Sequence, residues 1–181
     1  YRTLVVDVQD VYDEFSAGVF DPNAIHDFLA YAYSTYTPPA PQFVVLVGDG
    51  HYDFKNAFAY NPAEPVYIPP FLADVDPFMG ETAADNRYVT LVGNDLIPDM
   101  HLGRLPVKTL AEAATMVDKI INYEQNPPAT NWNQTITFVA DNADSAGNFA
   151  DLSDAIANNY VPSQYVEEKI YYTYPGFPDA A

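Results

Sequence analysis

Short apolar runs alternate with amphipathic stretches along this chain, and the two patterns predict strands and helices in turn. The uninterrupted apolar run at residues 43–47 is typical of a strand that is covered on both faces in a parallel sheet. Asp21 and Pro22 are typical of a helix start, as the N-cap and the first helical residue. The helix that follows spaces its apolar residues three or four positions apart, at Ile25, Phe28, Leu29, Ala32, Tyr33 and Tyr36.

The rest of the chain continues this alternation of strands and helices. We expect further strands at 4–8, 88–92, 100–105, 135–140 and 169–172, and further helices at 10–17, 109–126 and 149–160. Thr109 and Glu112 form a capping box, and the apolar stripe from Leu110 to Ile121 is expected to face inward. The proline-rich stretch 54–86 is predicted to be irregular. This order predicts one α/β domain over residues 1–181, a three-layer αβα sandwich with a mostly parallel sheet.

Composition narrows the classes of function. The 181 residues carry 25 acidic side chains against 7 Lys and Arg, a formal net charge of −18, which opposes binding to nucleic acid or to anionic membranes. No apolar run approaches the roughly 20 residues that a spanning helix needs. The chain has no cysteine, which excludes disulfides and a cysteine nucleophile within these residues. It does not begin with Met, and we expect it to be a piece of a longer protein.

Polar residues follow the apolar run at 43–47, where a parallel sheet places its sites. Asp49, His51 and Asp53 form either a proton-transfer or metal cluster, or a structural loop whose carboxylates cap nearby amides. The loop lacks the lysine and glycine spacing of a phosphate-binding loop. No Gly-x-Ser-x-Gly motif supports serine hydrolase chemistry.

Arg104 follows a glycine at the end of a predicted strand, in a chain that is poor in basic residues. We expect it to form a buried or half-buried ion pair with a local carboxylate, such as Asp85 or Asp95. The alternative is that Arg104 binds an anionic group of a substrate. Dense aromatic residues between Tyr31 and Phe71 favour packing in the core and loops, with stacking on a sugar or peptide as the alternative.

An acidic loop precedes the predicted helix at 149–160. Its oxygen-bearing side chains are candidate calcium ligands, at Asp141, Asn142, Asp144 and Asn148. Their spacing is not that of an EF-hand. The alternatives are a solvated turn that caps the helix, whose dipole favours acids there, and a loop that lines a substrate site.

Several stretches together resemble the gingipain-type cysteine peptidases, whose catalytic domain has a caspase-like α/β fold. The stretches lie at 44–53, 84–88 with 92–95, 103–106, 119–124 and 140–144, in similar order and spacing. The resemblance implies peptide-bond hydrolysis by a Cys–His dyad that lies downstream of this segment. None of His26, His51 and His101 precedes a glycine, as the family's His does, so no catalytic residue is assigned here. We therefore expect the segment to be the N-terminal portion of a peptidase domain, incomplete and inactive alone. The alternative is a parent protein that has lost the dyad.

The resemblance also implies residues that determine substrate preference, and a cellular location for the protein. An acid near the start of the helix after the acidic loop lines the substrate pocket in arginine-specific members. Asp151 is the nearest acid here and implies a basic preference, whereas Phe149 in that place implies an apolar pocket. Family membership further implies a secreted or cell-surface bacterial protein, a structural calcium ion, and a protein or peptide substrate. The alternative is a non-catalytic, calcium-stabilised binding module on a bacterial surface.

Overall fold

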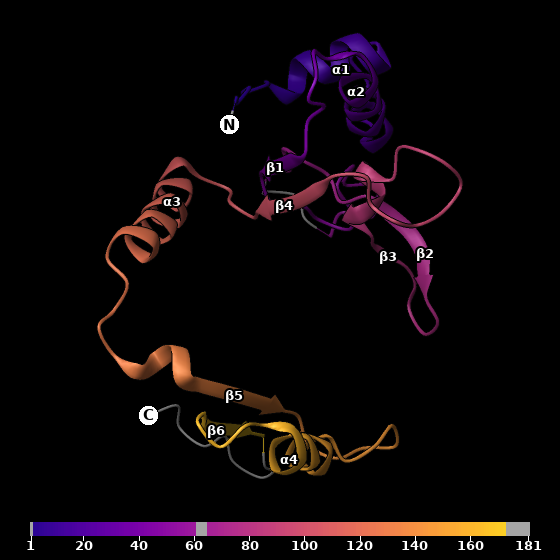
Figure 1. The fold of residues 1–181 in the computed structure, drawn as a ribbon. Coiled ribbons are helices and arrows are strands. Elements are labelled where there is room, and N and C mark those ends of the chain that lie inside the picture. Colours follow the sequence, from indigo (N-terminus) through magenta and orange to yellow (C-terminus); the bar gives the residue numbers. More distant parts are fainter. Residues whose placement is uncertain (1, 61–64, 173–181) are drawn as a thin grey trace. The chain divides into compact units, whose positions relative to one another are not determined.

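The computed structural model describes residues 2–60 and 65–172, which fall into two units, 1–121 and 122–181. Figure 1 shows the elements in chain order. The α-helices are α1 (Val8–Ser16), α2 (Pro22–Thr35), α3 (Leu110–Gln125) and α4 (Phe149–Tyr160). The strands are β1 (Phe43–Val47), β2 (Leu72–Asp76), β3 (Gly80–Ala83), β4 (His101–Leu105), β5 (Thr135–Ala140) and β6 (Val166–Tyr171). Two 3₁₀ helices are η1 (Asp85–Val89) and η2 (Asn131–Gln134).

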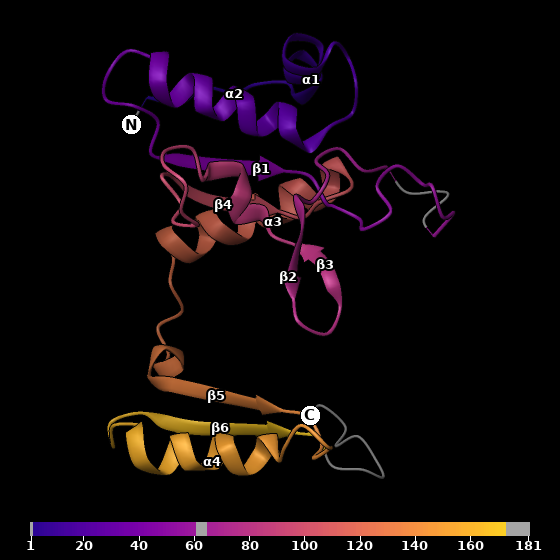
Figure 2. The same cartoon turned by 90° about the vertical axis from the view of Figure 1, so that its right-hand side faces the viewer.

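The first unit is built on the parallel pair β1–β4, whose register runs from Phe43 opposite His101 to Val47 opposite Leu105. In Figure 2, α1 and α2 lie on one side of this pair. The core between them is apolar and includes Val11, Tyr12, Ala24, Ile25, Leu29, Leu46, Ile68, Tyr88, Val89 and Met100. Tyr88 is fully buried, and its hydroxyl donates to the carbonyl of Pro69 at 2.7 Å. Burial raises the pKa of Tyr88, so this hydroxyl stays a donor.

Both N-terminal helices begin where an aspartate caps them. Asp21 accepts a hydrogen bond from the backbone N–H of Asn23 at 2.9 Å, which confirms the predicted start of α2. Asp7 accepts from the N–H of Gln9 at 2.9 Å, so α1 begins at Val8 and the strand predicted at 4–8 is wrong. A short apolar run before an N-cap resembles a strand in sequence, because it has no polar positions whose spacing would distinguish a strand from other structure.

Two other expectations for the first unit are corrected by the structure. The strand predicted at 88–92 is wrong, because residues 85–89 form η1 and β4 pairs with β1 instead. The stretch 54–86 is not wholly irregular, since it contains the antiparallel hairpin β2–β3. Its tip carries Asp76, which accepts hydrogen bonds from the N–H groups of Phe78 and Met79 at 2.8 Å each. Such an aspartate turn closes a hairpin without the usual Asn-Gly signal.

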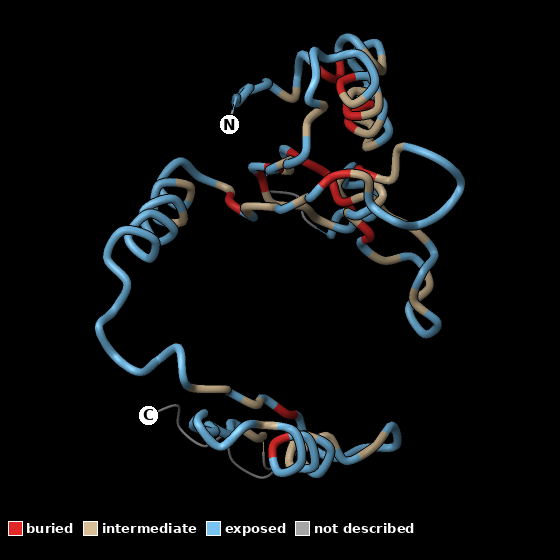
Figure 3. The backbone as a smooth tube through the Cα atoms, in the orientation of Figure 1, coloured by how far each residue is buried: buried red, intermediate tan, exposed pale blue. Residues whose placement is uncertain are grey.

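Burial of β1 and α3 also departs from the expectation. Alternate residues of β1 are open, with Val45 at 60% exposure and Leu46 at 6%, so the strand is covered on one face only. Helix α3 begins after Thr109, whose hydroxyl accepts from the N–H of Glu112 at 3.2 Å, but it contributes no buried residue. Figure 3 shows α3 as mostly exposed. An apolar stripe predicts which side of a helix suits burial, while burial itself requires a partner element.

The second unit pairs β5 with β6 in parallel, from Thr135 opposite Val166 to Ala140 opposite Tyr171. Helix α4 and strand β5 have the predicted bounds, and β6 begins three residues before the predicted start. Asp154 of α4 accepts hydrogen bonds from Lys169 Nζ at 2.9 Å and the Tyr171 hydroxyl at 2.8 Å. These bonds join the helix to the strand. The predicted α/β class, with parallel strand pairs, is confirmed.

Replacing Asp154 should remove an acid-sensitive link between α4 and β6. Hydrogen bonds from Lys169 and Tyr171 lower the pKa of Asp154. The carboxylate therefore stabilises the fold above its unfolded-state pKa of about 3.9, and this stabilisation is lost as pH falls through the folded-state pKa. The bond to Asp154 raises the pKa of Lys169, so the lysine contributes below its unfolded-state pKa of about 10.4 and loses the contribution as pH rises through its folded-state pKa.

We expect Asp154→Asn to lower the melting temperature at pH 7 and to flatten its fall between pH 5 and pH 2 (roughly the range over which aspartates protonate). Circular dichroism melts over this range give the measurement. Asp118→Asn on exposed α3 is the matched control and should behave as wild type. Identical acid limbs for wild type and Asp154→Asn would contradict the role of this carboxylate.

Candidate functional site

The carboxyl ends of β1 and β4 meet in a loop that starts at Gly48. The Gly48 N–H donates to the Leu105 carbonyl and the Asp49 N–H to the Val107 carbonyl, both at 3.0 Å, so the pairing continues past the strands. Gly48 has φ +154°, and a Cβ added there would come within 2.9 Å of the Ile68 side chain. Only glycine fits this close approach, and the segment 67–70 therefore lies directly against the strand end.

Arg104 lies at the centre of this strand end, with its side chain only 15% exposed. Its Nη1 donates to the carbonyls of Gly48 at 2.9 Å and Ile68 at 2.8 Å, and its Nη2 donates to that of Pro69 at 3.1 Å. Its Nε lies 2.7 Å from Asp85 Oδ2. Every nitrogen of the guanidinium therefore has an acceptor from the protein, which is the planar, multidentate geometry that lysine cannot reproduce.

Asp85 extends this network on the other side. Its Oδ1 accepts from the N–H of Phe71 at 3.1 Å while its Oδ2 faces Arg104. Of the two acids that the sequence offered to Arg104, the structure places Asp85 there, whereas Asp95 accepts from the N–H of Ile97 at 2.9 Å. The arrangement supports a structural role for Arg104, since its donors face the protein's own backbone.

The acids and histidine of the strand-end loop each have a structural partner. The Asp53 carboxylate accepts from the N–H groups of Ala57, Phe58 and Tyr60 at 2.7, 2.9 and 3.2 Å. Burial alone raises the pKa of Asp53, but these bonds lower it, and the net pKa lies below its ordinary value. His51 Nδ1 accepts from the N–H of Asp53 at 3.0 Å. These contacts support the capping interpretation of the loop rather than a proton-transfer cluster.

Asp49 completes the loop. Its Oδ1 accepts from the N–H of Gly50 at 2.9 Å, and its Oδ2 lies 3.6 Å from Lys108 Nζ. Across residues 2–60 and 65–172, no group of three or more His, Asp or Glu side chains could hold a metal ion. Nothing in this loop beyond the residue types themselves supports proton transfer or metal binding by Asp49, His51 and Asp53.

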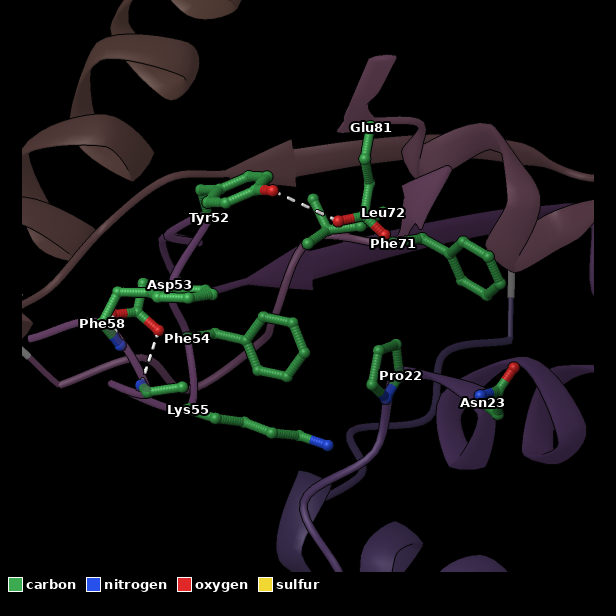
Figure 4. Close-up of a pocket in the computed structure, with 11 residues that line it drawn as sticks. Pro22, Asn23, Tyr52, Asp53, Phe54, Lys55, Phe58, Phe71, Leu72 and Glu81 are labelled. Atoms are coloured by element: carbon green, nitrogen blue, oxygen red, sulfur yellow. Dashed lines mark hydrogen bonds between the residues drawn. The ribbon is translucent and has the colours of Figure 1, made fainter. Parts of the chain in front are cut away.

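A cleft of about 470 Å³ opens beside the loop, and its lining could not be assembled from the sequence alone. Figure 4 shows its walls, which come from the start of α2, the loop after β1 and the base of the β2–β3 hairpin. They include Pro22, Tyr52, Phe54, Lys55, Phe58 and Glu81. The signal in the sequence was the density of aromatic residues, but only the fold brings α2 and the hairpin to the same loop.

In the second unit, the candidate calcium ligands lie in the loop before α4. Asn148 is the N-cap of α4, and its Oδ1 accepts from the N–H of Asp151 at 3.3 Å. Asp141 accepts from the N–H of Asn142 at 2.8 Å, and Asp144 from that of Ala146 at 2.7 Å. These contacts fit the capped-turn alternative. A calcium ion would have to compete with these amides for one oxygen of each side chain.

The two candidate specificity residues lie on the first turn of α4. Asp151 is exposed and Phe149 is half-buried. Asp151 is the acid of that turn, where the positive end of the helix dipole favours a negative charge. A carboxylate in this place is open to a cationic partner.

Arg104→Lys should destabilise the first unit by about 2 kcal/mol, because an ammonium keeps the charge but leaves buried carbonyls without donors. Arg104→Met should cost more, about 3 kcal/mol, because Asp85 then loses its charged partner. Urea denaturation followed by circular dichroism gives the measurement. The control is Arg87→Lys, which should lie within about 0.5 kcal/mol of wild type. Equal stabilities for Arg104→Lys and Arg87→Lys would show that the guanidinium geometry does not matter.

Comparison with known proteins places the chain in a family. The model of peptidase family C25 matches residues 1–180. Dimeric latent PorU from Porphyromonas gingivalis is 27% identical with a TM-score of 0.53, over 72% of this chain and 14% of that one. The RgpB complex of pro- and mature domains from Porphyromonas gingivalis is 22% identical with a TM-score of 0.56, over 92% of this chain and 39% of that one.

The chain thus spans well under half the length of either solved structure. No curated protein matches it. The likeness to both structures agrees with the α/β fold with parallel strand pairs described for the two units. The family match covers nearly every residue, and it confirms the resemblance drawn from the strand-end and acidic-loop stretches. The chain belongs to peptidase family C25, the gingipain family.

Proposed function

We propose that this chain forms part of a secreted, gingipain-like cysteine endopeptidase domain, and that it supplies scaffold and pocket wall while a Cys–His dyad lies outside these residues. The match to peptidase family C25 over residues 1–180 carries the proposal. The absence of any cysteine in the 181 residues requires that the nucleophile come from other polypeptide. The occupied contacts of Asp49, His51 and Asp53 are consistent with this division of roles.

The chemistry of the whole domain follows from the nucleophile. A thiolate attacks the carbonyl carbon of the scissile peptide bond, a histidine protonates the leaving amine, and backbone amides stabilise the oxyanion. Such a reaction needs the sheet edge to be held rigidly, because small displacements of the reacting groups reduce the rate steeply. The Arg104 network, which fixes the end of β1 against segment 67–70, is suited to that task.

We assign the pocket-lining role to Asp151 in preference to Phe149, since its carboxylate is exposed whereas the phenyl ring is half-buried. An exposed carboxylate favours a basic residue before the cleaved bond. The substrate is then a protein or peptide with arginine or lysine at that position. Among the described residues, no helix has the length and apolar character needed to cross a membrane.

The extracellular setting and the calcium ion are further parts of the proposal. The family of the chain and its wealth of Asp and Asn support a bacterial protein that works outside the cell. Asp141, Asn142, Asp144 and Asn148 supply oxygen ligands of the kind that calcium prefers. The binding-module alternative has no observation of its own in its favour.

A thiol-specific reagent tests the division of roles. The 181-residue chain should hydrolyse no member of a peptide library, while the full-length parent should hydrolyse some and lose that activity on treatment with iodoacetamide. The chain has no cysteine to alkylate, so any inhibition must arise elsewhere in the parent. Hydrolysis by the isolated chain, or full activity of the alkylated parent, would refute the proposal.

Asp151→Asn in the full-length parent should lower kcat/KM for substrates with arginine before the cleaved bond by about 10- to 100-fold, because a charge-assisted hydrogen bond is lost. Substrates with an apolar residue there should be affected little. Asp118→Asn provides the matched control on α3. A uniform loss across both substrates would assign Asp151 to folding rather than to specificity.

Calcium should raise the melting temperature of the 181-residue chain if the acidic loop binds it, since a ligand that binds only the folded state stabilises it. The gain should disappear in Asp144→Asn and persist in Asp118→Asn. Magnesium at the same concentration controls for ionic strength, because it dehydrates reluctantly and prefers strict octahedral geometry. A melting temperature independent of calcium would remove the ion from the proposal.

A further inference from the structure

The cleft between α2, the loop after β1 and the β2–β3 hairpin has walls that are held in place by the protein itself. The three hydrogen bonds to Asp53 fix the loop from residue 53 to residue 60. Phe54 packs edge-on against Phe20, with ring centroids 5.7 Å apart. The Tyr52 hydroxyl donates to Glu81 Oε2 at 3.3 Å. A preformed cleft loses little entropy when it binds a ligand.

The polar groups of the cleft differ in whether they already have hydrogen-bond or ion-pair partners within the protein. Asp53 and Glu81 both accept hydrogen bonds from the protein. Lys55 has no ion pair or hydrogen bond among the described residues, and its Nζ lies 5.6 Å from the centre of the Phe54 ring. In Figure 4 its side chain extends past that ring along the cleft. The cleft thus presents aromatic surface and one cation, Lys55, that has no counter-ion within residues 2–60 and 65–172.

We infer that this cleft binds the C-terminal end of a peptide whose last residue is aromatic, with the ring against Phe54, Phe58 and Tyr52 and the α-carboxylate on Lys55 Nζ. The Lys55 Nζ lies 5.6 Å from the centre of the Phe54 ring, so a ligand that carries an anion and a ring close together can contact both groups. A C-terminal aromatic residue carries both on one Cα. A cleft of about 470 Å³ lies within the range of ligand sites and admits more than one residue.

The charge of the chain restricts the ligand further. With a net charge of −18, the protein repels peptides that carry several acids, so a single carboxylate is the charge that fits Lys55 best. Binding of a peptide C-terminus is a property in addition to the proposed peptidase activity, because it involves no bond cleavage. Hydrolysis of peptide bonds releases C-termini of this kind, yet binding itself requires no hydrolysis.

The probe is acetyl-Gly-Gly-Phe, compared as the free acid and as the C-terminal amide. Each is titrated into the isotope-labelled 181-residue chain, and amide shifts of residues 52–58 are followed by NMR. The free acid should bind about two- to fivefold more tightly than the amide, as expected for one solvent-accessible charge pair. Lys55→Gln should abolish this difference, and Lys119→Gln on α3 should preserve it.

Further variants and ligands test the aromatic wall and the recognition of the α-carboxylate separately. Phe58→Ala should weaken both ligands, because Phe58 is 65% exposed and its loss removes wall without disturbing the core. The amide of acetyl-Asp-Phe should bind no better than the amide of acetyl-Gly-Phe if the α-carboxylate is the recognised group. Equal affinity for acid and amide, no shifts at residues 52–58, or tight binding through the aspartate side chain would each overturn the inference.

Discussion

The guanidinium of Arg104 joins segments that are far apart in the sequence. It binds the carbonyl after β1, two carbonyls of segment 68–69 and the carboxylate at the start of η1. Buried carbonyls without donors would each cost free energy, so a single cation satisfies polar groups that the core could not otherwise enclose. Gly48 allows the close approach that this geometry needs. The contact holds the end of β1 against segment 68–69 and the start of η1.

Local backbone chemistry accounts for part of the acidic composition. Asp7 and Asp21 cap helices, Asp53 closes the loop after β1, and Asp76 closes a hairpin. Asp99 accepts from the N–H groups of Leu91 and Val92 at 2.6 and 2.9 Å. Each carboxylate satisfies amides that would otherwise lack acceptors at element ends. A high count of aspartates therefore does not by itself indicate metal sites.

The cleft is formed by residues of the first unit alone. The family match extends over residues 1–180, while the cleft is defined by residues between 22 and 81 of the first unit. Its walls are held by an aromatic pair and by Asp53, in the loop that Arg104 anchors through Gly48. The network around Arg104 thus positions both the sheet edge and the loop that forms one wall of the cleft.

The sequence by itself determined the local elements whose signals are local. The Asp21-Pro22 start of α2 and the bounds of β1, β5 and α4 arise from neighbours in the chain. The family resemblance was also present in the order of short motifs. Tertiary structure decided what depends on distant partners: that Asp85 rather than Asp95 meets Arg104, that 85–89 is a 3₁₀ helix, and that β1 is covered on one face. Contacts with distant residues can override the secondary-structure propensity of a segment, and the local sequence of that segment does not reveal which contacts it will make.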